Sequence, residues 1–126
     1  MQRNFAGIGA ILMLLAVALG AFGAHVLEPH IGEKAIGTYE TGVHYHMIHG
    51  LGILLASVAA GFGGETRRLV WANRLFLTGI VLFSGSLYLM AVTGWRWLGP
   101  ITPLGGVSFI AGWLMFALAV TGRSRS

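Results

Sequence analysis

Four long apolar stretches, separated by short polar segments, make up most of the chain. A helix of roughly 20 apolar residues covers about 30 Å, the thickness of a bilayer's hydrocarbon core. The pattern therefore predicts an all-α membrane protein with four transmembrane helices in an up-down antiparallel bundle, forming a single integral membrane domain over residues 1–126. The predicted spans lie at about residues 5–26, 41–63, 72–93 and 103–121.

Proline and threonine positions refine the ends of these helices. Pro29 predicts the end of the first helix, because proline cannot continue the hydrogen-bond ladder. The loop from Glu28 to Glu40 is expected to contain a short interfacial turn of helix. At the start of the fourth span, we expect Thr102 to act as the cap and Pro103 to occupy the first turn.

Composition agrees with a membrane location. Hydrophobic residues make up 56% of the chain and charged residues 10%, whereas a soluble domain carries about 25% charged residues. A net charge of +4 on so apolar a chain does not suggest a nucleic-acid partner, so the lipid bilayer is the expected partner. The absence of cysteine excludes disulfides and thiolate-based sites, and we predict no cofactor.

The distribution of Lys and Arg predicts the orientation of the spans. Six of these residues fall in the two terminal tails and the middle loop, and two fall in the other two loops. By the positive-inside rule, both termini of a multi-pass membrane protein with this distribution should be cytoplasmic. The six are Arg3, Arg67, Arg68, Arg74, Arg123 and Arg125, and the two are Lys34 and Arg96.

Small residues recur on one stripe of each predicted span. Gly20 and Gly23 mark such a stripe on the first span, Gly52 on the second, and Gly105 and Gly112 on the fourth. Gly106 and Pro103 of the fourth span are also expected to take part in helix packing. Helices in lipid associate through close van der Waals contact, which small residues permit. These stripes are expected to face neighbouring helices.

Histidine, tyrosine and serine residues are expected to form a polar cluster in the outer third of the bundle. Ionisable groups inside a membrane are costly and are often functional. On the second span His46 and His49 should point inward, whereas His44 should lie at the interface beside Glu40. The members of the predicted cluster are His25, Tyr45, His46, His49, Ser84, Ser86 and Tyr88.

Several roles remain open for His49. It could hydrogen-bond to Ser84, Tyr88 or a backbone carbonyl, and we expect its ring to approach the segment 84–88. A histidine pair could instead hold a metal or haem, or line a path for a small solute. Catalysis is not expected, because the chain has no Asp to orient a histidine base and no nucleophile-elbow motif beside its serines.

Four stretches of the sequence, in order and with matching spacing, resemble the small membrane proteins of the family named domain of unknown function 423. They are Gly20-Ala21-Phe22-Gly23-Ala24-His25, Tyr45-His46-Met47-Ile48-His49, Leu82-Phe83-Ser84-Gly85-Ser86-Leu87-Tyr88 and Thr102-Pro103-Leu104-Gly105-Gly106-Val107-Ser108-Phe109. The resemblance implies a four-span protein of the bacterial inner membrane with no established reaction.

Carried over by position, the family pattern selects residues that overlap the inward faces. These are His25, Tyr45, His49, Ser84, Ser86, Pro103, Gly105 and Gly106. Some members of the family have Gln at the position of His46, which argues against two histidine ligands on one helix. If a histidine pair exists, His25 and His49 form the better one.

Three hypotheses for function follow. The first is a non-enzymatic structural or accessory protein of the inner membrane, which assembles with itself or with a larger membrane complex. The alternative is a transporter or binding protein for a lipid or small solute, with an outer pocket lined by His25, Tyr45, His49 and Ser84. The third is a metal or haem site in the same place.

Overall fold

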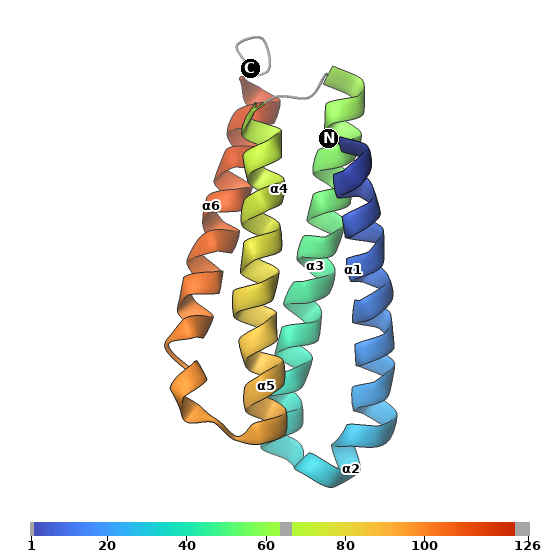
Figure 1. Cartoon of the computed structure of the whole chain (residues 1–126), viewed down its shortest axis with the longest axis vertical. Helices are drawn as coiled ribbons and strands as arrows, with labels where there is room; N and C mark the ends of the chain where they lie inside the picture. The colour runs from blue at the N-terminus through green and yellow to red at the C-terminus, as the bar shows by residue number, and fades with distance from the viewer. Residues whose placement is uncertain (1, 64–66, 123–126) are drawn as a thin grey trace.

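The computed structural model describes residues 2–63 and 67–122, in which every long apolar stretch is helical (Figure 1). The first span comprises α1 (Gln2–Phe22), a π-helical turn η1 (Gly23–Leu27) and α2 (Glu28–Ile31). The second is α3 (Glu33–Gly63), and the third comprises α4 (Arg67–Gly79), the π-helical turn η2 (Ile80–Ser84) and α5 (Gly85–Thr93). A short 3₁₀ turn, η3 (Arg96–Leu98), precedes α6 (Ile101–Thr121).

Within this described part of the chain, four helices are long and apolar enough to cross a membrane, and they run alternately up and down (Figure 1). The predicted all-α fold is therefore confirmed. The helices extend beyond the predicted spans: α3 begins at Glu33 rather than 41, and α4 at Arg67 rather than 72. Hydropathy marks only the part of a helix that lipid surrounds, and polar turns continue beyond it.

Pro29 does not end the first helix, contrary to the prediction. It lies in the first turn of α2, directly after the π-helical turn η1. A proline inside a helix clashes with the carbonyl four residues earlier, and the wider π turn relieves that crowding. The helix ends instead at Gly32, whose φ of 89° lies in a region that residues other than glycine rarely adopt.

Thr102 does not cap the fourth helix either. The N-cap residue of α6 is Pro100, and it makes no side-chain hydrogen bond to the helix. The Thr102 hydroxyl pairs with the Ser86 hydroxyl at 2.5 Å, which ties α6 to α5. The Thr102 hydroxyl therefore bonds to the Ser86 hydroxyl of the neighbouring helix, not to a backbone N–H of its own helix. A capping pattern in the local sequence could not indicate this interhelical partner. Pro103 does lie in the first turn, as expected.

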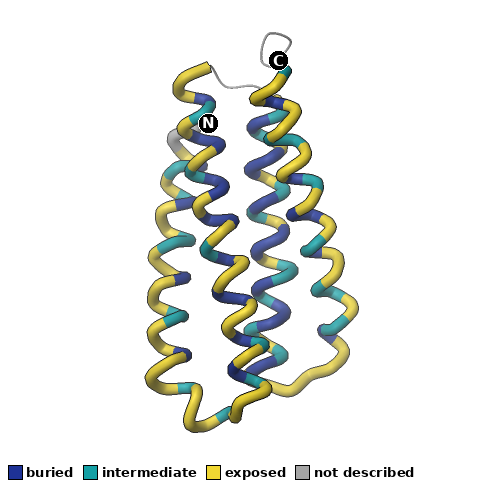
Figure 2. Tube along the Cα trace, turned by 180° about the vertical axis from the view of Figure 1, so that it is seen from behind, coloured by how far each residue is buried: buried dark blue, intermediate teal, exposed yellow. Residues whose placement is uncertain are grey.

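The four spans stand side by side in chain order, and both termini lie at the same end of the molecule (Figure 1). The two inner spans, α3 and α4–α5, carry most of the buried residues. The outer helix α1 packs mainly on α3, and α6 packs mainly on α4 and η2. Much of the surface of α1 and α6 is exposed (Figure 2), as expected for helices that face lipid.

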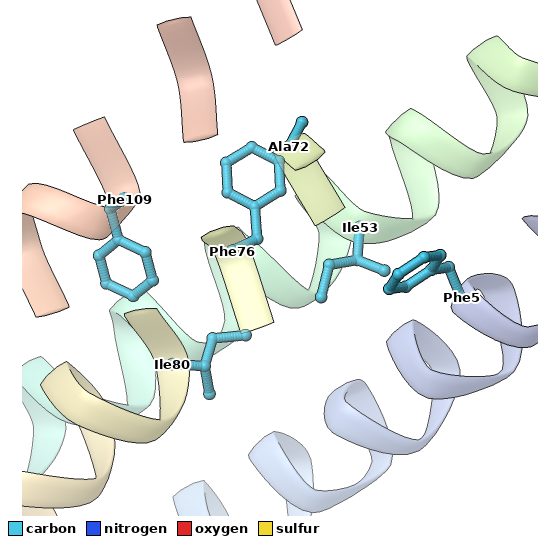
Figure 3. Close-up of a cluster of buried hydrophobic side chains, with 6 residues drawn as sticks. All are labelled: Phe5, Ile53, Ala72, Phe76, Ile80 and Phe109. Atoms are coloured by element: carbon cyan, nitrogen blue, oxygen red, sulfur yellow. The ribbon is translucent and has the colours of Figure 1, made fainter. Parts of the chain in front are cut away.

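The main hydrophobic core lies toward the middle of the bundle and draws on every span (Figure 3). Its buried side chains are Phe5, Ile53, Ala72, Phe76, Ile80 and Phe109. Phe76 is fully buried. Two smaller clusters lie on either side of it, one containing Tyr39 and Val43, the other Ala56 and Leu69.

The predicted small-residue stripes lie at helix contacts. Gly23 and Gly112 leave space for the rings of Tyr39 and Phe76, respectively, and Gly52 also adjoins Phe76. A Cβ added at Gly105 would overlap the Phe83 backbone, so α6 and η2 meet backbone to backbone.

Two glycines in the predicted packing set have looser surroundings. A Cβ at Gly20 would meet only the Val43 side chain, at 3.5 Å. A Cβ at Gly106 would meet only the ring of Phe83, at 3.9 Å. Gly106 therefore leaves a gap where its neighbour Gly105 makes a tight contact.

Candidate lipid-facing aromatic pocket

His49 forms a hydrogen-bonded link between α3 and α6. Its ring is buried, with 3% of the residue surface exposed. Nδ1 lies 2.8 Å from the Tyr45 carbonyl one turn earlier on α3, and the indole N–H of Trp113 donates to Nε2 at 2.9 Å. The predicted approach of His49 to the segment 84–88 is wrong, since its interhelical partner is on α6.

The two partners of His49 define the state of the imidazole. A backbone carbonyl can only accept a hydrogen bond, and an indole N–H can only donate one. Nδ1 therefore carries the proton and Nε2 presents its lone pair to Trp113. Protonation of Nε2 would set two N–H groups against each other, so this arrangement requires a neutral ring.

Aromatic rings surround His49 on several sides. The ring of Phe109 stacks on it with centroids 3.5 Å apart and planes 8° apart. Phe76 and Tyr45 lie 5.5 Å and 6.1 Å away between centroids. Stacked and tilted pairs of this kind add stabilisation beyond the area they bury. The result is a continuous aromatic wall between α3, α4 and α6.

A pocket of about 630 Å³ lies on the outer side of this wall, within the size range of small-molecule sites. It is lined by α3, η2 and α6, including Tyr45, His49, Phe83 and Trp113. Its rim residue Ile110 is 71% exposed, and Val107 is similarly exposed. Because these residues lie within membrane-spanning helices, the pocket opens sideways toward lipid.

Most polar side-chain atoms in the wall already make hydrogen bonds. Both ring nitrogens of His49 and the indole N–H of Trp113 bond to one another or to backbone. The hydroxyl of Tyr45, a residue that is 41% exposed, makes no hydrogen bond to another residue in the described part of the chain. The pocket is thus an apolar surface with one available hydroxyl.

His46 lies in a different, closed environment. Its Nδ1 is 2.8 Å from the hydroxyl of Tyr88 on α5, and the residue is 3% exposed. Nε2 is buried and has no hydrogen-bond partner among the described residues. Tyr39 adds a ring contact to Tyr88 and donates to the Leu19 carbonyl at 2.6 Å.

The two predicted serines bind backbone rather than the histidines. Ser84 donates to the Gly42 carbonyl at 2.7 Å and is fully buried, which fastens η2 to α3. Ser86 donates to the Phe83 carbonyl at 2.9 Å and pairs with Thr102. Ser84 does not line the pocket with His49, contrary to the hypothesis of an outer pocket built from both.

His25 lies outside the cluster as well. It is exposed on the π-helical turn η1, at the end of the first span, and does not line the pocket of Tyr45 and His49. Residues on a π turn are displaced from the face that a regular helix would give them. The predicted pairing of His25 with His49 is therefore wrong, and His44 is exposed as expected.

Metal or haem ligation does not fit this geometry. The lone pair of His49 is already used by Trp113, and Nδ1 of His46 bonds to Tyr88, so in these two rings Nε2 of His46 alone has no hydrogen-bond partner among the described residues. Within residues 2–63 and 67–122, no group of three or more His, Asp or Glu side chains comes together. A metal at His49 would need Trp113 to leave its position.

Three residues that matter to the pocket were missed from the sequence: Phe83, Phe109 and Trp113. Trp113 carries the clearest signal, because it lies in the middle of α6, whereas tryptophan is usual at the ends of spans. Phe109 precedes it by one helical turn and so shares its face. The π turn that places Phe83 has no such signal.

Comparison with known proteins identifies the family. The sequence profile described as "Protein of unknown function (DUF423)" matches residues 19–106. The chain belongs to this family. The resemblance seen in the sequence is thereby confirmed, and the matched region covers α3, η2 and the start of α6.

Curated relatives align with nearly the whole chain. The UPF0382 membrane protein YwdK of Bacillus subtilis is 51% identical over 122 residues, covering 94% of this chain and 96% of its own. The UPF0382 membrane protein SH2409 of Staphylococcus haemolyticus is 44% identical over 118 residues, with 94% and 95% covered.

A third relative, the UPF0382 inner membrane protein YgdD of Escherichia coli K12, is 43% identical over 120 residues, with 92% and 86% covered. No solved structure matches the chain. These names and the four spans confirm an integral membrane protein.

Proposed function

We propose that this protein is a non-enzymatic lipid-binding protein of the bacterial inner membrane, whose lateral pocket holds one hydrocarbon chain of a membrane lipid. The supporting observation is the aromatic wall itself. Its imidazole and indole groups pair with each other, which leaves an apolar surface that opens sideways between α3 and α6. Such a surface suits a hydrocarbon chain better than an ion or a polar solute.

The dimensions of the pocket support a chain from one leaflet. The lining residues of α6 run from Pro103 in its first turn to Trp113. At 1.5 Å per residue this is about 15 Å, half of the hydrocarbon thickness of a bilayer. One acyl chain that enters near Pro103 would end beside Trp113.

A non-enzymatic role is supported by the polar groups. Ser84 and Ser86 donate to backbone carbonyls, and each buried histidine bonds to an aromatic side chain on another helix. Such bonds join helices in the membrane and leave no serine beside a histidine base. His46, Ser84 and Ser86 of the predicted polar cluster thus join the helices that carry the pocket.

Gly106 provides a test that separates the pocket from the fold. A side chain here has room, because a Cβ meets only the Phe83 ring at 3.9 Å, and it would project into the pocket. Gly106→Leu should therefore fill the pocket without separating the helices. Gly7→Leu is the matched control, since nothing lies within 4 Å of a Cβ on this exposed glycine of α1.

The readout uses Trp113 as the single tryptophan, after replacement of Trp71, Trp95 and Trp97 by Phe. In vesicles of phospholipids with brominated chains, bromine should quench Trp113 strongly in the parent protein and in Gly7→Leu, and less in Gly106→Leu. Equal quenching in all three would contradict chain binding in the pocket.

We also propose that both termini face the cytoplasm. Arg67, Arg68 and Arg74 lie at the end of the bundle that carries the termini, and Lys34 and Arg96 at the other. Arg123 and Arg125, which also entered the prediction, lie outside the described residues. Reporter fusions at Ser126 and between Glu28 and Glu40 should report opposite sides, with Ser126 inside, and an external Ser126 reporter would refute the orientation.

A further inference from the structure

The start of α4 carries an exposed stripe of two arginines and a tryptophan. Arg67, Trp71 and Arg74 follow one another at helical spacings of four and three residues, so they share one face, and each is exposed. The guanidinium of Arg74 lies 5.1 Å from the centre of the Trp71 ring, a cation–π distance. Trp71 thereby fixes the position of the Arg74 charge.

The two arginines of this stripe differ from their neighbour Arg68. The guanidinium of Arg68 donates to the Leu118 carbonyl at the end of α6, at 3.1 Å. Neither Arg67 nor Arg74 makes a hydrogen bond or ion pair with another side chain in the described part of the chain. Their charges remain available to a ligand.

No acidic side chain balances these charges within residues 2–63 and 67–122. Glu28, Glu33 and Glu40 all lie at the opposite end of the bundle. Glu65 is the remaining acid of the sequence, against six arginines in the tails and middle loop. This end of the molecule is therefore electrostatically complementary to an anion.

The depth of the stripe matches the phosphate layer of a bilayer. The third span ends at Thr93. About 30 Å of helix, the thickness of a hydrocarbon core, extends back from Thr93 to near Asn73. Arg74 thus lies at the hydrocarbon edge, and Arg67 lies about 10 Å further out. The headgroup layer is about 5 to 8 Å thick on each side, so its phosphates lie between the two guanidinium groups.

We infer that Arg67, Trp71 and Arg74 bind the phosphate of an anionic phospholipid in the leaflet at the end that carries both termini. Arg67 and Arg74 approach the phosphate from its two sides, and guanidinium groups donate to phosphate oxygens in pairs. The indole ring of Trp71 lies at the headgroup level, where tryptophan is favoured. This site is separate from the aromatic pocket and belongs to the other half of the bundle.

Native mass spectrometry of the protein released from vesicles of equal phosphatidylglycerol and phosphatidylcholine tests the site. Each arginine near a membrane surface contributes about 1 kcal/mol, or about fivefold, so two give about a thirtyfold preference for retained phosphatidylglycerol. Arg67→Gln with Arg74→Gln should abolish the preference. Lys34→Gln with Arg96→Gln is the matched control, because it also removes two positive charges, both at the opposite end of the bundle.

The outcomes separate a lipid site from general attraction. Retention of the preference by Lys34→Gln with Arg96→Gln, and its loss in Arg67→Gln with Arg74→Gln, would support the site. Equal loss in both would overturn it, since net charge alone would then be responsible. Displacement of the retained lipid by millimolar inorganic phosphate would also overturn it, because a free anion would then suffice. Gly106→Leu should leave the preference unchanged, so this site and the pocket can fail independently.

Discussion

Two histidines one turn apart on α3 lie in contrasting surroundings. His46 faces a closed contact among α1, α3 and α5, where Tyr88 and Tyr39 fill the space left by glycines. His49 faces α6, where Gly106 leaves a gap and the wall opens to lipid. Histidine thus takes part in a closed helix contact at position 46 and in the wall of a pocket at position 49. The difference lies in the neighbouring helix, not in the histidine.

Replacement of the two adjacent glycines of α6 should give the largest contrast. Gly105→Leu forces a side chain against the Phe83 backbone, so α6 must separate from η2. Overpacking typically costs about 1 to 3 kcal/mol, and we expect the upper end or more here, because no flexible side chain can yield. Gly106→Leu should cost far less. Thermal unfolding in detergent measures both, and similar melting temperatures would refute the assignment of a tight and an open side.

Removal of the buried histidines should have the next largest effect. His49→Leu leaves the Trp113 indole N–H without its partner in the lipid-facing pocket, where no water replaces it, and an unpaired donor there costs about 1 to 3 kcal/mol. His46→Leu should cost a similar amount through Tyr88. His44→Leu, an exposed control on the same helix, should be nearly neutral.

The two histidine variants should differ in a spectroscopic signal. In a protein whose only tryptophan is Trp113, His49→Leu should shift the emission, whereas His46→Leu should not. An equal shift in both variants would contradict the separation of the two environments.

Ser84→Ala should have a smaller effect. It removes a bond to the Gly42 carbonyl, and hydrogen bonds between membrane helices average about 0.6 kcal/mol, with a maximum near 1.7. Thr78→Ala, on the exposed face of α4, is the control and should not change stability. The loss should appear as a lower melting temperature with quenching of Trp113 unchanged, since Ser84 does not line the pocket. Reduced quenching in Ser84→Ala would link the closed side to the pocket.

Tyr45→Phe should have the smallest effect on stability, within about 0.5 kcal/mol, because its hydroxyl has no partner among the described residues. The aromatic contacts to Phe83 and Phe109, at 4.6 Å and 6.0 Å, remain in this variant. A large loss of stability would show that the hydroxyl has a structural partner. The melting temperature of Tyr45→Phe, compared with that of the parent protein, shows whether the hydroxyl has such a partner.

The sequence was sufficient to predict the four helices, because lipid imposes a length and an apolar composition that few other structures share. It also indicated that His46 and His49 face inward, since helical periodicity fixes their direction relative to the small residues. It could not indicate which helix each histidine meets, because that depends on how α3 and α6 are placed in space.

The π turns explain three further errors. Hydrophobic periodicity assumes a regular helix, and η1 and η2 each shift the residues that follow. His25 therefore lies on the exposed surface, and Ser84 donates to the Gly42 carbonyl of α3 rather than to His49 of the same helix. The continuation of the helix past Pro29 has the same cause, because the π turn before Pro29 accommodates its ring.

The central claim is that the pocket beside Tyr45, Phe109 and Trp113 holds a lipid chain. An experimental density map of the protein in lipid nanodiscs tests it most directly. We expect elongated density from near Pro103 to Trp113, with the Trp113 indole still bonded to His49, and loss of that density in Gly106→Leu. A pocket closed by its own side chains, or density unchanged by Gly106→Leu, would show that the pocket does not hold a lipid chain.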